Sequence, residues 1–174
     1  NKMIEPQDWL EFGQKFHGHK CPAMPMGLRF GAAAMNALGV ERAKDGQLIA
    51  FVDLGEDHCA TCFGDGLQVI MGTTFGKGNL KKTHKGKWAV TVVDRVTGRA
   101  VRVSPKAEAM LNNKKTKFAP DEMLLTVSEI FHFDFEPKKD SFDSFVCEEC
   151  GEMTVMEYGR IKGDKKVCID CAGK

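Results

Sequence analysis

Two histidines and a cysteine fall within five consecutive positions near the start of the chain, as His17, His19 and Cys21. In an extended segment alternate side chains point the same way, so these three groups could project toward one point. Imidazole nitrogen and thiolate sulfur are preferred ligands of zinc and related metals, which makes the segment a candidate metal or redox site. The alternative is a surface loop that carries two ordinary histidines and a small buried thiol.

A second group of candidate ligands lies further along the chain, where His58, Cys59 and Cys62 occur together. The Cys-x-x-Cys spacing of Cys59 and Cys62 also fits a redox pair, in which one thiol has a lowered pKa. It does not fit haem attachment, because Phe63 and not histidine follows the second cysteine. The two groups together hold more ligands than one tetrahedral ion needs. A mixed His/Cys site with one open position would suit zinc or another borderline metal acting as a Lewis acid or water activator.

Four further cysteines form two Cys-x-x-Cys pairs near the end of the sequence, Cys147 with Cys150 and Cys168 with Cys171. Four thiolates at this spacing are typical of a tetrahedral structural zinc site. A segment this small has too little apolar surface to fold without its ion. Because four ligands leave no open position, we expect this zinc to be structural and not catalytic. Two redox disulfides or an iron-sulfur cluster are the alternatives.

The composition limits the classes of function. The 174 residues are 43% hydrophobic, which is enough for one sizeable core and a small appended module. A net charge of +1 gives no argument for nucleic-acid binding, and the lysine clusters at 81–87 and 114–117 are typical of solvated surfaces. No apolar run is long enough for a membrane span, no signal-peptide pattern is present, and the cysteine spacing suits a reducing compartment. We therefore expect a cytoplasmic protein that binds neither nucleic acid nor membranes.

Helices and one strand must position the first two groups of ligands. The expected elements are a helix through 6–17, a helix over 26–38, a buried strand over 48–54 and a helical segment over 66–72. Gly18 and Gly39 are placed to end the first two helices. Because Cys21 lies just before the second helix, the free N–H groups of that helix could lower the pKa of its thiol.

The second half of the chain predicts a hairpin and further helices before the cysteine-rich segment. The expected elements are strands over 88–93 and 100–103 joined across Thr97-Gly98, a helix capped by Ser104 with Pro105 at its first position, a helix from Pro120 with an apolar face of Met123, Leu124, Val127, Ile130 and Phe131, and a strand over 131–136. The polar stretch 137–144 is typical of a linker. We therefore expect a core domain over 1–140 and a zinc finger over 141–174.

A glycine-rich loop at 73–80 surrounds Lys77. Its backbone amides and the lysine could bind an anion, although the spacing is not that of the phosphate loop of nucleotide hydrolases. A generic tight turn is the alternative.

Three ordered blocks of sequence resemble the FmdE family, which comprises the FmdE component of formylmethanofuran dehydrogenase and its stand-alone relatives. The blocks are Phe16-His17-Gly18-His19-Lys20-Cys21-Pro22 with Gly27-Leu28-Arg29, then Cys62-Phe63-Gly64-Asp65-Gly66-Leu67-Gln68-Val69, then Gly72-Thr73-Thr74-Phe75-Gly76-Lys77-Gly78-Asn79-Leu80. The resemblance implies an α+β fold with an antiparallel-sheet core and flanking helices, a small C-terminal zinc finger of the zinc-ribbon or treble-clef type, and a homodimer with a cleft lined by the motif. Carried over by position, the cleft residues are His17, His19, Cys21, Cys62, Asp65 and Lys77. Cys59 stands outside the family motif and is an addition in this chain.

The residues and the resemblance together predict a metal-binding protein with a second zinc or other transition metal in the core. The metal ligands would come from His17, His19, Cys21, Cys62 and Cys59, with a small-molecule ligand nearby. In a catalytic version Cys21 or Cys62 is a ligand or nucleophile, His19 a ligand or base, and Lys77 an anion clamp, as in an oxidoreductase component. The resemblance places such a protein beside the other polypeptides of a partner enzyme, in one-carbon metabolism or molybdenum-enzyme assembly. The alternative is a non-catalytic scaffold that docks partners through its zinc finger and the aromatic stretch 131–135.

Overall fold

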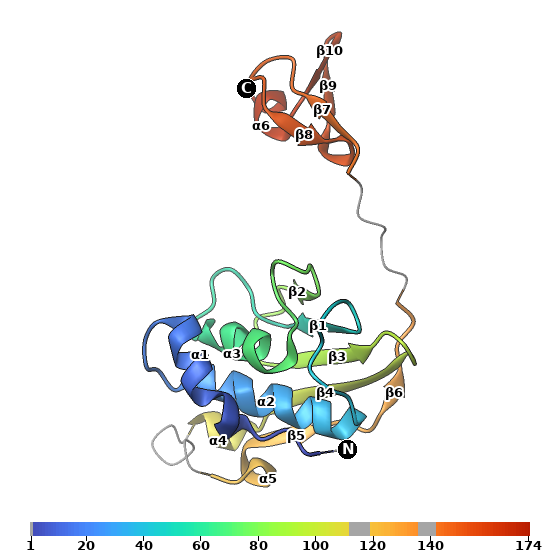
Figure 1. Ribbon diagram of the computed structural model, residues 1–174. Coiled ribbons are helices and arrows are strands. Elements are labelled where there is room, and N and C mark those ends of the chain that lie inside the picture. Colours follow the sequence, from blue (N-terminus) through green and yellow to red (C-terminus); the bar gives the residue numbers. More distant parts are fainter. Residues whose placement is uncertain (1, 112–118, 136–141) are drawn as a thin grey trace. The chain divides into compact units, whose positions relative to one another are not determined.

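The computed structural model describes residues 2–111, 119–135 and 142–174, and it divides the chain into two compact units (Figure 1). The first unit covers Asn1–Phe135 and the second Glu136–Lys174. Part of the linker predicted at 137–144 lies outside the described residues. Each unit is described by itself below.

The helices in the first 72 residues form close to where the apolar spacing predicted them. They are the 3-10 turn η1 (Pro6–Trp9) and the α-helices α1 (Leu10–His17), α2 (Ala23–Leu38) and α3 (Cys62–Met71). Gly18, Gly39 and Gly72 follow α1, α2 and α3 in the left-handed conformation, which ends each helix at little cost because glycine has no Cβ. Helix α2 begins at Ala23, earlier than predicted, and α3 begins at Cys62.

A mixed sheet forms the second layer of this unit. Its strands are β1 (Leu48–Val52), β2 (Leu80–Lys82), β3 (Val90–Asp94), β4 (Arg99–Pro105), β5 (Leu125–Val127) and β6 (Phe131–His132). The order is β2-β1-β3-β4-β5, and β6 also pairs with β4. The predicted hairpin of β3 and β4 is confirmed, and each of these pairings is antiparallel except that of β1 with β2. The α+β class with an antiparallel-sheet core is therefore confirmed, with one parallel edge that the sequence did not predict.

Two helix predictions in the second half are only partly confirmed, because the first helix begins later and the second ends earlier than predicted. Ser104 and Pro105 belong to β4, and the following helix α4 begins at Ala107 and runs to Leu111. The helix after Pro120 is the short α5 (Asp121–Leu124), after which the chain enters β5. The apolar face predicted there does not form, because Leu125 pairs opposite Pro105 and Met123 is 65% exposed.

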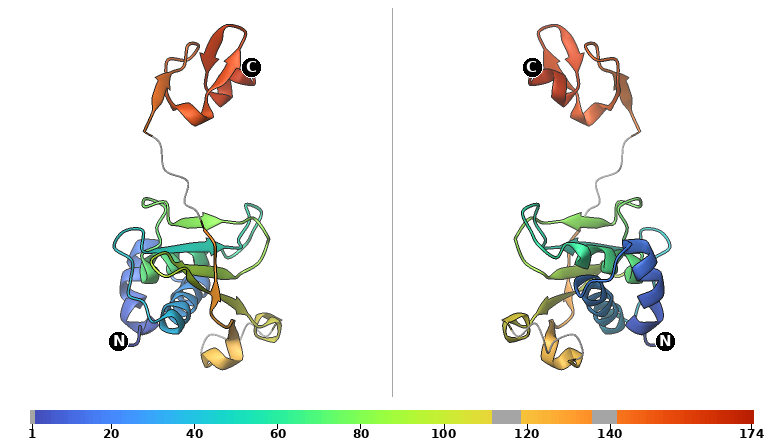
Figure 2. Two further views of the ribbon diagram at one scale, coloured as in Figure 1. Left: turned by 90° about the vertical axis from the view of Figure 1, so that its right-hand side faces the viewer. Right: turned by 90° about the vertical axis from the view of Figure 1, so that its left-hand side faces the viewer.

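The two faces of the sheet are covered by different elements, and Figure 2 shows the helices on one side of the sheet. Helices α2 and α3 cover one face in a continuous apolar core that includes Leu28, Met35, Leu67, Ile70, Val92 and Val101. A smaller cluster of Ile49, Val93 and Ala100 lies apart from that core, and Phe51, Phe133 and Phe135 pack on it. The predicted aromatic strand is thus β6 followed by a segment whose rings cover this cluster.

Helices α2 and α3 touch backbone to backbone. A Cβ on Gly27 would lie 2.2 Å from the carbonyl oxygen of Phe63, and a Cβ on Gly66 would lie 2.1 Å from that of Met24. Only glycine allows such an approach. This contact fixes the start of α3 beside the start of α2, and it therefore fixes Cys62 relative to Cys21.

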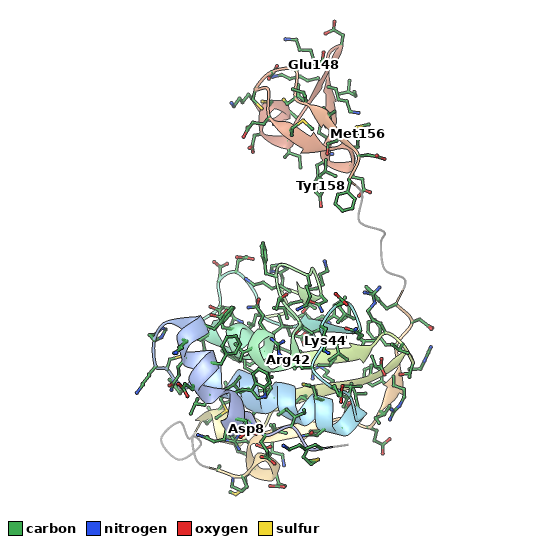
Figure 3. All side chains as sticks on the ribbon, in the orientation of Figure 1. Asp8, Arg42, Lys44, Glu148, Met156 and Tyr158 are labelled. Atoms are coloured by element: carbon green, nitrogen blue, oxygen red, sulfur yellow. The ribbon has the colours of Figure 1, made fainter. Side chains whose placement is uncertain are left out.

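The second unit is a small arrangement of two hairpins and a helix turn. Its elements are β7 (Ser144–Val146), β8 (Met153–Val155), η3 (Met156–Tyr158), β9 (Arg160–Lys162), β10 (Lys165–Val167) and α6 (Ile169–Ala172). Its buried cluster consists of Cys147, Val167 and Cys171, with Cys168 packed against them. Apolar side chains such as Met156 and Tyr158, labelled in Figure 3, are exposed.

Among the described residues no helix combines the length and apolarity needed to cross a bilayer.

Candidate metal centres

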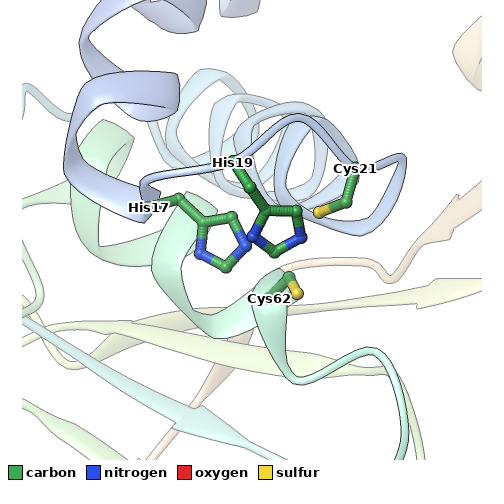
Figure 4. Close-up of side chains that lie close together, drawn as sticks. All are labelled: His17, His19, Cys21 and Cys62. Carbon is green, nitrogen blue, oxygen red and sulfur yellow. The ribbon is translucent and has the colours of Figure 1, made fainter.

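Four metal-ligating side chains meet in the first unit: His17, His19, Cys21 and Cys62. One ligand atom from each lies within 4.8 Å of all the others. Figure 4 shows the two imidazoles between the loop that carries Cys21 and the first turn of α3 that carries Cys62. Two nitrogens and two sulfurs at this separation suit a tetrahedral zinc or a related borderline ion.

The segment 17–21 does not present its ligands in the way the sequence suggested. His17 is the last residue of α1 and is not part of an extended run. Gly18, with a φ of +94°, turns the chain after the helix, and Pro22 is the N-cap residue of α2. A helix end, a short turn and a helix start therefore replace the predicted alternation of side chains.

His17 is held in the orientation of a metal ligand. Its Nδ1 lies 2.6 Å from Oδ2 of Asp65, and its Nε2 is buried without a hydrogen-bond partner among the described groups. The hydrogen bond to the Asp65 carboxylate raises the pKa of His17, although burial opposes it. In the neutral ring the Asp65 carboxylate retains the proton on Nδ1, so the lone pair of Nε2 is free. A carboxylate behind the ligating histidine is the usual support of a metal site.

The two thiols of this cluster have opposite pKa shifts. Burial raises the pKa of Cys21, but the backbone N–H of Met24, the Cys62 thiol and the N–H of Ala23 together lower it below its ordinary value. Burial, and then the hydrogen bond to Cys21, raise the pKa of Cys62. The N–H groups at the start of α2 thus act on Cys21 as its position in the sequence suggested. Cys21 therefore ionises before Cys62, and a bound cation would stabilise both thiolates.

A chain of hydrogen bonds leads from His17 along α3 to a surface loop. Gln68 Nε2 donates to Oδ1 of Asp65 at 3.2 Å, and Gln68 Oε1 accepts from the backbone N–H of Phe75 at 3.0 Å. Phe75 is 90% exposed. Gln68 is not among the functional residues that the sequence indicated, although it lies one helical turn after Asp65, on the same face of α3.

His58 and Cys59 are not part of the four-residue cluster. His58 packs its ring against Trp88, with 4.4 Å between centroids, and its Nδ1 accepts from the N–H of Gly55. Cys59 is an exposed free thiol in the loop before α3. The prediction of Cys59 as a ligand of the core metal therefore does not match the geometry, because only Cys62 of this pair is carried into the cluster by α3.

Among the described residues no hydrogen bond or ion pair joins the Lys77 side chain to the cluster. Lys77 lies in the loop after the C-terminal end of α3, whereas Cys62 is at the N-terminal end of this helix, which is about 15 Å long for ten residues. The amides of the loop are already used: Thr74 donates to Asn79, Phe75 to Gln68 and Lys77 to Thr74. The predicted anion clamp thus lacks free amides at these three positions.

The second unit brings its four cysteines together. The sulfur atoms of Cys147, Cys150, Cys168 and Cys171 lie within 4.8 Å of one another. The first pair lies at the turn between β7 and β8, and the second at the start of α6, as in a treble clef. The backbone N–H of Cys150 lowers the pKa of Cys147 to about 6, whereas burial and the neighbouring thiols raise that of Cys171 to about 12. Four thiols this close cannot all ionise unless a cation is bound.

Two cavities flank the segment Cys21-Pro22. One of about 480 Å³ is lined by apolar side chains that include Phe63 and Trp88, and by Cys59. The other, of about 580 Å³, is more polar and is lined by Cys21, Lys20 and other residues. A small molecule therefore has space beside Cys21 in the second cavity and against Pro22, which lines both cavities.

Comparisons with known proteins match both units. The family model described as "FmdE, Molybdenum formylmethanofuran dehydrogenase operon" matches residues 16–130, and the "Prokaryotic dksA/traR C4-type zinc finger" matches residues 141–174. A crystal structure of an FmdE-like protein of the tungsten formylmethanofuran dehydrogenase type, from Syntrophus aciditrophicus, aligns with a TM-score of 0.74. The alignment covers 99% of this chain and 96% of that one at 22% identity, and it shows the same fold.

A curated relative from Archaeoglobus fulgidus is described as a probable S-adenosyl-L-methionine-binding protein. It is 31% identical over 197 aligned residues, which cover 92% of this chain but 51% of the relative. The chain thus spans about half the length of this relative.

Proposed function

Because the chain belongs to the FmdE family and carries a C4-type zinc finger, we propose that its core unit binds a second transition metal through His17, His19, Cys21 and Cys62. The observation that carries the proposal is the buried Nε2 of His17. It has no hydrogen-bond partner among the described groups and belongs to a set of four ligand atoms within 4.8 Å. An unpaired buried nitrogen is costly, and a metal ion would satisfy it.

The four core residues have distinct parts in this proposal. Asp65 keeps the proton on His17 Nδ1, and the N–H groups at the start of α2 favour the Cys21 thiolate. His19 is exposed and lies in the turn after α1, so it is the ligand that an incoming molecule displaces most easily. A zinc or similar ion there would supply Lewis-acid chemistry to such a molecule.

The proposed role is accessory to formylmethanofuran or other one-carbon metabolism, or to molybdenum-enzyme redox chemistry. This role rests on the family alone, since the fold is compatible with several activities. The relative from Archaeoglobus fulgidus makes S-adenosyl-L-methionine a small molecule to test, because the aligned half includes most of this chain. A homodimer in the cytoplasm is part of the same proposal, and light scattering of the purified protein would measure its mass.

Metal analysis of purified full-length protein tests the core site. We expect two metal ions per chain in the wild type, one in Cys62→Ser and two in the matched control Cys59→Ser. Cys59 is a suitable control because it is a free cysteine in the loop just before α3 and outside the cluster. One ion per chain in the wild type, with an intact zinc finger, would contradict the proposal. Thermal unfolding of each variant would verify that the core remains folded.

The alternative function is a scaffold that docks partners without a core metal. It is favoured by exposed apolar side chains on the second unit, such as Phe142 and Ile161. The stretch 131–135 supports this alternative less than predicted. The rings of Phe133 and Phe135 pack on Phe51, with centroids 5.4 and 5.5 Å away, and are therefore less available to a partner. The single-ion result described above would favour this alternative.

A further inference from the structure

The cavity of about 480 Å³ beside the core cluster has the character of a binding site for an uncharged ring. Its walls include Met26, Phe30, Phe63, Trp88 and Leu124, and none of the described side chains that line it is charged. The size falls in the range of small-molecule sites, which are usually apolar with a few polar groups at one end. A charged group would lose its hydration there without gaining a partner.

The cavity is lined by the chain neighbours of both cluster thiols. Pro22 and Ala23 line it and directly follow Cys21, and Phe63 lines it and directly follows Cys62. A ligand in the cavity therefore lies against the two segments that carry both thiols.

The aromatic walls are held in place by other contacts. Phe30 and Phe63 meet edge to face, with 5.0 Å between centroids, and the ring of His58 supports Trp88. The loop beside them includes Ala60, a non-glycine residue with a φ of +59°, and Cys59, whose exposed thiol also lines the cavity. Residues held in such sparsely populated conformations often occur at ligand sites. Cys59, which lies outside the four-residue cluster, thus lines this cavity, and His58 supports one of its walls.

We propose that the cavity binds an uncharged aromatic group of a small molecule whose polar end reaches the core metal. The first half of this inference, the aromatic site, does not depend on the metal. The second half rests on the proposed function. Aromatic walls favour a ring through edge-to-face and offset contacts in addition to the area buried.

The aromatic site can be tested with Trp88 as the reporter. The chain has two tryptophans, so Trp9→Phe leaves Trp88 alone. In this variant we expect p-cresol to shift the tryptophan emission saturably, and benzoate, a negatively charged aromatic molecule of similar size, to have no effect. Adding Ala109→Phe, which fills the cavity, should weaken p-cresol binding at least about tenfold, corresponding to about 1.4 kcal/mol. The control is Ala107→Phe, an exposed position on the same helix α4 that does not line the cavity.

Equal p-cresol binding in the Ala109 and Ala107 variants would overturn the aromatic site, and so would equal binding of benzoate. A second measurement needs no cavity variant. In the otherwise wild-type chain p-cresol should slow alkylation of Cys59 by iodoacetamide, as followed by peptide mass spectrometry. Unchanged alkylation of Cys59 at a saturating p-cresol concentration would also contradict the proposal.

The link to the metal is tested with phenylmethanethiol, an uncharged aromatic ring of similar size that carries a thiol on its methylene carbon. In the metal-loaded chain it should bind at least about tenfold more tightly than p-cresol, and this advantage should disappear in Cys62→Ser. No advantage in a chain that contains two metal ions would overturn the second half alone. A core without metal would overturn the second half and the proposed function together, whereas the p-cresol result would still decide the aromatic site.

Discussion

The two metal-ligand clusters of this protein differ in what positions their ligands. In the second unit the cysteines themselves form most of the buried cluster, with Val167 as the one other buried hydrophobic residue among those described. In the first unit the ligands lie at the ends of helices that pack on a large apolar core and on each other through Gly27 and Gly66. The cysteine cluster of the second unit therefore stabilises the fold around it, whereas the fold of the first unit positions the ligands of the core cluster. We therefore expect the four core residues to keep their arrangement without a metal ion, whereas the four cysteines of the second unit should not.

The largest expected effect is loss of the second unit when its metal ligands are lost. Cys147→Ser should unfold residues 142–174, because so small a core does not offset the chain entropy without the ion. Hydrogen exchange followed by mass spectrometry should then show full exchange in this unit and unchanged protection in α2 and β3. Retained protection in β9 and β10 would show that the unit folds without its metal.

The next effect concerns the helix contact that builds the core cluster. Gly66→Ala puts a Cβ 2.1 Å from the carbonyl oxygen of Met24, so the helices must separate. We expect a loss of about 3 kcal/mol in the free energy of unfolding of the first unit, measured by urea titration, together with weaker core metal binding.

Gly64→Ala is the matched control on the same helix α3. Its Cβ would meet Leu54 Cδ1 at 3.8 Å, an ordinary contact, and alanine favours helix over glycine by up to about 1 kcal/mol. Its unfolding free energy should therefore stay equal or rise. Equal losses in both variants would mean that close helix packing does not set this site.

A smaller effect is expected when the support of His17 is removed. Asp65→Asn keeps the size of the side chain but not the charge that holds the proton on His17 Nδ1. Loss of such a supporting carboxylate usually lowers metal affinity about 10–100-fold. Competition with a chromophoric chelator should show this loss for one of the two ions, with the zinc finger unchanged. An unaltered affinity for both ions would place Asp65 outside the metal site.

The smallest effect is expected at Lys77. Because Lys77 follows the far end of α3, Lys77→Ala should change the core metal affinity less than about twofold, a difference well below about 1.4 kcal/mol. The same chelator competition measures it. A large loss would mean that Lys77 reaches the cluster in an assembly of more than one chain, which light scattering would then reveal.

The sequence predicted the elements that have strong local signals. The β-branched runs around Thr97-Gly98 indicated the hairpin β3–β4, and Gly18 and Gly39 marked the ends of α1 and α2. Pro105 was misleading, because proline is common at the first position of helices but is here the last residue of β4. The apolar spacing after Pro120 also matched a helix, although pairing of Leu125 with β4 decided the outcome.

The core site was only half visible in the sequence. His17, His19 and Cys21 are close together in the chain, so their meeting is a local property. The choice of Cys62 over Cys59 depends on where α3 begins and on how closely it approaches α2, which is a tertiary property. The small residues Gly27 and Gly66 within apolar helices were the available signal for that approach.

Gln68 links the core cluster to a surface loop through hydrogen bonds. Its amide group joins Asp65, behind His17, to the backbone of Phe75, whose side chain projects from the loop after α3. A molecule that binds this loop and shifts Phe75 would change the position of Asp65 and thereby the metal affinity of His17. Metal binding would change the affinity of the loop for that molecule by the same factor, because such coupling is reciprocal. A partner that binds the exposed ring of Phe75 would therefore respond to metal binding at the core cluster, and would in turn change the metal affinity.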